Sequence, residues 1–180
     1  VIIETRVSDI DGMVQVLIPA GEFQMGSEDG SSDESPLHTV YLDAFWIDQT
    51  EVTNAMYVAF MNQRGNQSAG GVTWLDDTDL NVLIERVDGV WRPKSGYEDH
   101  PVIEVSGYGA QAYCEWAERR LPTEAEWEKA ARGGLEGAKY SWGDEDPVCT
   151  PDAQNGARSK GCPDFTVAVG AYGFNGYGLY

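Results

Sequence analysis

Histidine is scarce in this sequence, and the scarcity excludes several kinds of catalytic centre. Only His38 and His100 occur among the 180 residues, so the chain cannot by itself supply a multi-histidine metal centre. There is also no Gly-x-Ser-x-Gly nucleophile motif and no phosphate-binding loop that ends in Gly-Lys-Ser or Gly-Lys-Thr. We therefore assign no catalytic residue, and we expect each histidine to be structural or to lie on the surface.

Basic residues are also few, with 12 Lys and Arg against 30 Asp and Glu and a formal net charge of -18. Phosphate binding needs Lys and Arg concentrated on one face, so nucleic acid is excluded as an expected partner. An acidic surface suits divalent cations, although it more often serves solubility alone.

Long hydrophobic runs are missing as well, so the sequence predicts no membrane span. Hydrophobic residues nevertheless make up 42% of the chain and aromatic residues 11%, which favours an ordered domain over disorder. The 21 glycines, nine tyrosines and six tryptophans favour a loop-rich fold with aromatic anchors over a helical bundle. The length suits one domain.

Cysteine occurs three times, and the three positions differ in their surroundings. Cys149 and Cys162 flank a loop rich in Pro, Asp and Gly, and they could close a small disulfide in an oxidising compartment. The alternative is a pair of free thiols in a reducing compartment. Cys114 lies within an apolar helical pattern and is expected to be a buried structural thiol. The acidic surface, the disulfide and the loops together favour an extracytoplasmic or cell-surface location.

Local patterns predict an α+β domain with short antiparallel strands, about three helices and more than half of its residues in loops. Alternating apolar residues predict strands near 13–18, 22–25 and 39–47. The first two are expected to pair as a hairpin through the turn at residues 19–21. Apolar residues at helical spacing, with their caps, predict helices near 54–63, 109–119 and 124–132.

The segment 66–100 has no regular period, but it is not expected to be a linker. It contains four large apolar side chains that need burial: Trp74, Leu83, Ile84 and Trp91. We therefore expect an ordered insertion within the domain, with residues 89–93 as one arm of a short hairpin.

The third predicted helix has the clearest local signature. Thr123 and Glu126 form a capping box, in which the threonine oxygen accepts from the N3 amide and the glutamate reaches back to the N-cap amide. The helix is expected to stop at Gly133. Trp127 and Trp116 are expected to be buried apolar anchors.

Two arginines flank this helix, and both are expected to have structural roles. Arg120 and Arg132 could pair with carboxylates from Glu51, Glu124 or Glu128. A buried arginine–carboxylate fork would hold the helix against the strands.

Eight phrases occur in a characteristic order along almost the whole chain. They are residues 18–26 (IPAGEFQMG), 45–48 (FWID), 51–54 (EVTN), 100–102 (HPV), 113–116 (YCEW), 120–134 (RLPTEAEWE and AARGG), 142–143 (WG) and 175–180 (NGYGLY). This series resembles the formylglycine-generating-enzyme, or sulfatase-modifying-factor, family, and the run at 120–128 is the most specific part. The resemblance implies a C-type-lectin-like fold.

The resemblance also implies that residues 1–180 form a single domain that is incomplete at its C-terminus, because the family continues beyond Tyr180. In the enzymes a copper-binding cysteine pair follows later, so copper is expected only if further sequence carries that pair. Two functions remain open. One is an oxidase that uses copper and dioxygen to convert a sulfatase cysteine to formylglycine. The other is a non-catalytic module that binds a ligand or protein through variable loops, and the resemblance makes a protein or a peptide the expected kind of ligand.

A calcium site is a further implication of the resemblance. In the family an Asn side chain, the next carbonyl, a downstream Asp and another carbonyl hold the ion. The matching positions are Asn155, Gly156, Asp164 and Phe165. Oxygen ligands on a turn-rich loop suit calcium, which tolerates irregular geometry. The alternative is an ordinary turn at Asn155 with a surface acid at Asp164.

Overall fold

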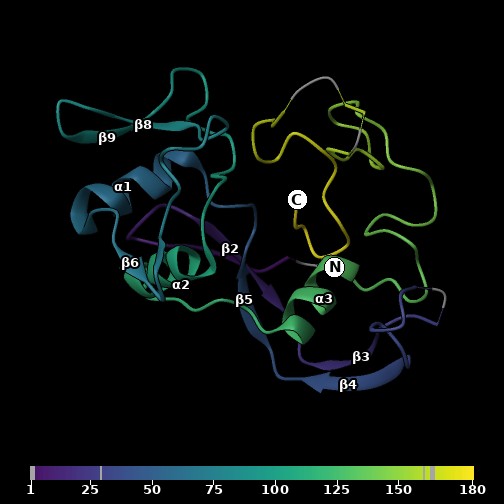
Figure 1. Cartoon of the computed structure of the whole chain (residues 1–180). Helices are drawn as coiled ribbons and strands as arrows, with labels where there is room; N and C mark the ends of the chain where they lie inside the picture. The colour runs from purple at the N-terminus through teal and green to yellow at the C-terminus, as the bar shows by residue number, and fades with distance from the viewer. Residues whose placement is uncertain (1–2, 29, 160, 163–164) are drawn as a thin grey trace.

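The computed structural model describes residues 3–28, 30–159, 161–162 and 165–180. Its helices are α1 (Asn54–Arg64), α2 (Gly107–Trp116) and α3 (Glu124–Arg132). Its strands are β1 (Thr5–Val7), β2 (Val14–Ile18), β3 (Gly21–Met25), β4 (His38–Leu42), β5 (Phe45–Asp48), β6 (Ser68–Ala69), β7 (Val72–Thr73), β8 (Ile84–Val87) and β9 (Val90–Pro93) (Figure 1). The predicted α+β class and loop-rich character are confirmed.

The sheets are small and antiparallel, and their pairing corrects one prediction. β2 pairs with β1 and β5, while β3 pairs with β4, so the hairpin expected between residues 13 and 25 does not form. Gly21 has a φ of 144°, a conformation open to glycine, and the chain turns there out of the β2 sheet. The predicted strand at 39–47 is likewise two strands, because the chain crosses between the sheets at Asp43.

The helices agree more closely with the sequence patterns. α3 has the predicted bounds, and α1 is one residue longer than predicted. α2 lies two to three residues before the predicted 109–119, because the Ser106 side chain accepts from the Gly109 amide and caps the helix early. Within the described part of the chain, no helix is both long enough and apolar enough to cross a membrane.

The larger hydrophobic cluster joins α1 and α2 to the segment 66–100. Tyr57, Phe60 and Tyr113 form its aromatic centre, with ring centroids 5.3 to 5.7 Å apart. Leu83, Ile84 and Trp91 are buried as expected, and Trp74 stacks on Phe60. The expected arm at 89–93 contains β9, which pairs with β8.

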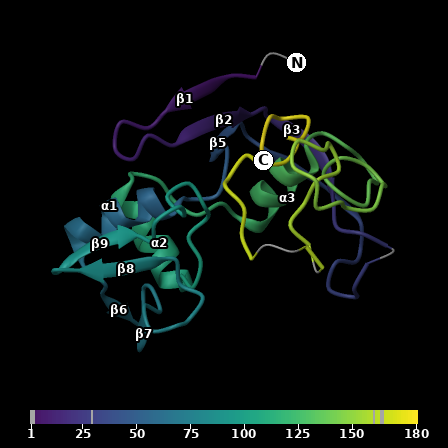
Figure 2. The ribbon, with the colours of Figure 1, turned by 90° about the horizontal axis from the view of Figure 1, so that it is seen from above.

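The smaller cluster lies where α3 packs against the three-stranded sheet. Val16 and Ile18 of β2 contact Ala130 of α3 and Leu179, which lies at the far end of the chain. Both views of the ribbon place the irregular region after α3 beside that helix and away from α1 and α2 (Figures 1 and 2). α3 is therefore the regular element that the second half of the fold is built around.

Polar contacts hold α3 in place at its side. The Lys129 side chain is 3% exposed, and its Nζ donates to the carbonyls of Pro19 at 2.8 Å and Gly21 at 2.9 Å. Glu128 accepts from the Gly26 amide at 2.8 Å, and Arg132 donates to the Gly26 carbonyl at 2.9 Å. The connections at both ends of β3 are thus tied to the helix.

The C-terminal end of α3 is closed by a distant asparagine. Asn175 donates from Nδ2 to the carbonyls of Ala130 at 2.8 Å and Ala131 at 3.1 Å. Its Oδ1 accepts from the backbone amides of Tyr177 and Leu179. These bonds satisfy carbonyls that the helix leaves open and fix the last turn of the chain against it.

We predict that Lys129→Met lowers the free energy of unfolding by about 2 kcal/mol, because the carbonyls of Pro19 and Gly21 lose the charged donor that the buried Lys129 supplies. The exposed Lys139 provides the matched control, and Lys139→Met should change stability by less than about 0.5 kcal/mol. Urea unfolding of the three proteins measures the difference. Equal losses for the two substitutions would contradict the structural role of Lys129.

Candidate binding cleft

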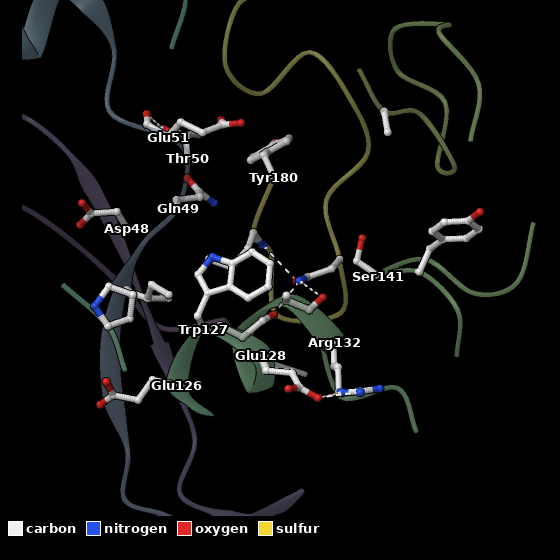
Figure 3. Close-up of a pocket in the computed structure, with 18 of the residues that line it drawn as sticks. Asp48, Gln49, Thr50, Glu51, Glu126, Trp127, Glu128, Arg132, Ser141 and Tyr180 are labelled. Atoms are coloured by element: carbon white, nitrogen blue, oxygen red, sulfur yellow. Dashed lines mark hydrogen bonds and ion pairs between the residues drawn. The ribbon is translucent and has the colours of Figure 1, made fainter. Parts of the chain in front are cut away.

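An open cleft of about 1970 Å³ lies along α3. One wall comes from the end of β5 and the connection to α1, and another from the segment 165–180. Figure 3 shows Trp127 of α3 in the middle of this space, with Gln49, Thr50 and Tyr180 across from it. The cleft therefore joins three parts of the chain that are far apart in sequence.

Trp127 contradicts the expectation that it is a buried anchor, because it is 62% exposed. The buried positions of α3 are Glu126, Lys129 and Ala130, which form one stripe at helical spacing. Two of these three are charged, so the hydrophobic pattern placed the buried face one residue too far along the helix. Trp127 falls outside that stripe and lines the cleft instead.

Other large apolar side chains line the cleft without being buried. Besides Trp127 they are Leu37, Leu121, Leu135, Phe165 and Tyr180, each at least 39% exposed. Single exposed apolar residues are ordinary, but a group of them in one concave surface is typical of an interaction site.

The expected capping box at the start of α3 is confirmed. Thr123 Oγ1 accepts from the Glu126 amide at 3.3 Å, and a Glu126 oxygen accepts from the Thr123 amide at 2.8 Å. Gly133 ends the helix in the left-handed conformation. The same Glu126 carboxylate is held by Arg120 through bonds of 2.6 and 2.7 Å, and these bonds lower the pKa of Glu126 to about 2.

The pairing expected for Arg132 is confirmed, and the pairing expected for Arg120 is wrong. Arg132 pairs with Glu128 at 2.6 Å, as expected. Arg120 pairs with Glu126 and not with Glu51, Glu124 or Glu128. Its side chain is 65% exposed, so this fork lies at the surface and is not the expected buried one.

A second ionic cluster supports the cleft at β5, and no sequence pattern indicated it. Arg119 donates from both terminal nitrogens to Asp11, which also accepts from the Tyr113 hydroxyl at 2.6 Å and from the Met13 amide at 3.2 Å. Burial would raise the pKa of Asp11, but these hydrogen bonds outweigh it and lower that pKa to about 2. The partners lie about a hundred residues apart, so local spacing could not reveal them.

Asp48 links this cluster to the cleft that it lines. Its Oδ1 accepts from Gln15 Nε2 at 3.0 Å and lies 3.4 Å from Arg119 Nε. Burial nevertheless raises the pKa of Asp48, because these contacts do not fully offset desolvation. The carboxylate thus faces the cleft as a partly desolvated acceptor.

The structure describes three of the four expected calcium ligands, and two of these three lie in one turn. Asp164 lies outside the described residues. Asn155 and Gly156 lie in one turn, where the Asn155 carbonyl accepts from the Val148 amide at 3.0 Å. The Phe165 carbonyl accepts from Arg158 Nε at 3.2 Å, which places a positive charge beside that candidate ligand. Among the residues described, no group of three His, Cys, Asp or Glu could hold a metal.

The expected disulfide between Cys149 and Cys162 is present, with the two Cα atoms 5.5 Å apart. Cys114 is a half-buried free thiol on α2, and burial raises its pKa to about 11. His38 is exposed, and His100 lies 2.7 Å from the Thr166 hydroxyl through its Nδ1. Both histidines therefore match their expected structural or surface roles.

The fold is that of the C-type-lectin-like domains found in formylglycine-generating enzymes, and comparison with known proteins agrees. Residues 3–180 match the family described as the sulfatase-modifying factor enzyme 1-like domain, and the chain belongs to this family. It is 40% identical to a formylglycine-generating enzyme of Streptomyces coelicolor, over 73% of this chain and 51% of that protein.

Two further relatives show the range of proteins that contain this domain. The serine/threonine-protein kinase pkn1 of Chlamydia pneumoniae is 37% identical over 92% of this chain and 25% of the kinase. The solved structure of PvdO from Pseudomonas aeruginosa superposes with a TM-score of 0.68 at 26% identity, covering 98% of this chain and 69% of that one. The chain thus spans about half of the Streptomyces enzyme and a quarter of the kinase.

We predict that acid destabilises the protein partly through Asp11. Its folded pKa of about 2 lies below the ordinary value of 3.8, so its contribution is complete above the ordinary value and is lost as the pH falls towards 2. In Asp11→Asn, the loss of unfolding free energy between pH 6 and pH 2 should shrink by roughly 2 kcal/mol.

Urea unfolding at a series of pH values measures this loss, and Asp33→Asn at an exposed position is the control. The raised pKa of Asp48 acts in the opposite direction, so it can mask part of the effect but cannot produce it. An unchanged pH dependence in Asp11→Asn would contradict the assigned role of the Asp11 cluster.

Proposed function

We propose that this domain binds a polypeptide segment in the cleft along α3. The observation that carries the proposal is the exposed Trp127 indole, which lies in a concave surface that Asp48 and Glu51 also line. An exposed aromatic side chain at the centre of a cleft supplies the anchor that concentrates binding energy at peptide and protein interfaces. A polypeptide ligand also suits the family, whose enzymes are named for a modification of sulfatases.

The charges around Trp127 favour a basic segment. Asp48 and Glu51 lie on one wall and Glu128 on another, and all three line the cleft. Glu128 is paired with Arg132, and Asp48 is paired with Arg119, so Glu51 is the carboxylate of the three that is better placed to meet an incoming cation. A guanidinium can also stack on an indole face, which would use Trp127 and this carboxylate together.

Peptide binding can be measured by fluorescence anisotropy with a labelled peptide that spans a sulfatase cysteine and its neighbours. We predict that Trp127→Ala weakens binding about tenfold, the loss of roughly 1.4 kcal/mol. Tyr41→Ala is the matched control, because Tyr41 is 61% exposed on β4 and does not line the cleft. Replacing the basic residues of the peptide with glutamine should also weaken binding.

Failure of the peptide to bind, or equal effects of Trp127→Ala and Tyr41→Ala, would contradict the proposal. Raised salt should lower the affinity for the basic peptide more than the affinity for its glutamine version, because salt screens the attraction between exposed charges.

A second candidate function is the copper-dependent oxidation of a sulfatase cysteine to formylglycine, which the identity to the Streptomyces enzyme favours. The residues of this chain do not fit a copper site. Thiolates are the ligands that Cu(I) prefers, whereas Cys149 and Cys162 are joined in a disulfide and the thiol of Cys114 has a raised pKa. Such an activity would require thiolates from outside residues 1–180.

Calcium binding by the turn at Asn155 is also proposed here. Asn155 and Gly156 supply an ordered pair of oxygens, and Asp164 would supply the carboxylate. The Phe165 carbonyl fits less well, because the Arg158 guanidinium beside it would repel the ion. One carboxylate and one opposing cation imply weak binding, since affinity follows ligand charge.

We therefore predict a modest rise in melting temperature from chelator to millimolar calcium, which Asp164→Ala abolishes. Arg158→Gln should enlarge the rise, because it removes the opposing charge. The stabilisation should grow with the logarithm of calcium once the ion is in excess. Magnesium at equal concentration controls for screening of the acidic surface. Identical melting temperatures with chelator and calcium, or equal responses to both cations, would contradict the site.

A further inference from the structure

The wall of the cleft opposite α3 has almost no hydrophobic core. Within the described part of residues 135–174, the structure contains no helix or strand, and Gly156 is the one buried residue. Both hydrophobic clusters draw their residues from outside this range. The wall must therefore be held by hydrogen bonds and by the disulfide between Cys149 and Cys162.

The disulfide loop supplies part of this wall and supports the rest. Gly156, Ala157 and Arg158 line the cleft directly. Backbone bonds join the loop to residues 171–173, from the Asp152 amide to the Ala171 carbonyl at 2.9 Å and from the Gly173 amide to the Ala153 carbonyl at 3.1 Å.

Close packing fixes the same contact. A Cβ atom at Gly156 would lie 2.6 Å from the Tyr172 ring, so the loop backbone rests directly on that side chain. Gln154 adds a bond from Nε2 to the Phe174 carbonyl at 2.9 Å. The segment 171–174 leads into Asn175, which caps α3, so the position of the loop is connected to the helix that carries Trp127.

From these contacts we propose that the Cys149–Cys162 disulfide is a redox control on the cleft, an inference that rests on the proposed binding of a polypeptide there. The oxidised protein holds the loop and the wall in the binding geometry. Cleavage of the disulfide frees the loop, which then loses order because no buried apolar side chain keeps it in place.

The chemistry needs a thiol reductant. A thiolate attacks one sulfur of the disulfide, a mixed disulfide forms, and a second thiol of the reductant resolves it. Two electrons pass to the protein, which gains two thiols, and the reductant leaves as its own disulfide. Cys149 is exposed and Cys162 is half-buried, so the attack can begin at Cys149.

The test compares peptide anisotropy titrations of the oxidised protein and of the same protein in dithiothreitol. We expect binding to weaken at least fivefold on reduction. The helical signal in far-UV circular dichroism and the aromatic signal in near-UV circular dichroism should both be retained, because the three helices and the aromatic cluster of α1 and α2 stay folded. The double variant Cys149→Ser, Cys162→Ser should bind as weakly as the reduced protein and should not respond to dithiothreitol. Cys114→Ser should behave as the unmutated protein in both states.

Hydrogen exchange supplies a second readout, because the amides of Asp152 and Gly173 should exchange faster after reduction while those of α3 do not. Equal affinity in the two redox states would overturn the proposal, as would a dithiothreitol effect that persists in the double variant. Cooperative unfolding of the whole chain on reduction would also overturn it, since the disulfide would then stabilise the entire fold and would not act on the cleft specifically. If the oxidised protein fails to bind the peptide, the proposed function itself is wrong.

Discussion

The arrangement of the second half of this protein depends on the hydrogen bonds made by the buried side of α3. A helix of nine residues is too short to be stable alone, and its one fully buried apolar residue, Ala130, contributes little area. Hydrogen bonds from charged and amide side chains therefore hold the helix against the rest of the domain, a role that a larger apolar stripe would otherwise have. Lys129 and Glu128 reach the connections around β3, and Asn175 closes the helix end.

This manner of docking explains why a cleft exists beside α3. Because polar side chains occupy the buried stripe, the large indole of Trp127 lies on the open side. The opposite wall consists of turns that are connected to α3 through Asn175 and to the preceding loop through the disulfide. The larger hydrophobic cluster around Tyr57 and Tyr113 packs against Val52 in the connection from β5 to α1, whereas Phe45 and Ile47 of β5 pack against the smaller cluster.

Sequence patterns predicted the parts of the fold that depend on local interactions. The capping box at Thr123 and Glu126 fixed the start of α3, and Gly133 fixed its end, because both act within one turn of the helix. The disulfide was predicted from two cysteines that bound one loop. The family and its fold followed from the order of the phrases, above all the run at 120–128.

Contacts between distant residues could not be predicted in this way. The pairing of β2 with β5 instead of β3 depends on which sheet each strand joins, and alternation carries no such information. The Asp11–Arg119 pair and the Lys129 contacts join residues about a hundred positions apart. Trp127 was misplaced partly for the same reason, since Lys129 can be buried only because the distant carbonyls of Pro19 and Gly21 accept from it. Glu126 is satisfied locally, by Thr123 and Arg120.

Native-state hydrogen exchange of two amides, one bonded to α3 directly and one bonded to the Asn175 cap of α3, tests the central claim most directly. The Gly26 amide donates to Glu128, and the Leu179 amide donates to Asn175, although both lie far from the helix in sequence. If α3 and these segments form one cooperative unit, the two amides should open with the same free energy as the amides in the last turn of α3. Opening of the Gly26 and Leu179 amides at a much lower free energy than those of α3 would contradict the account.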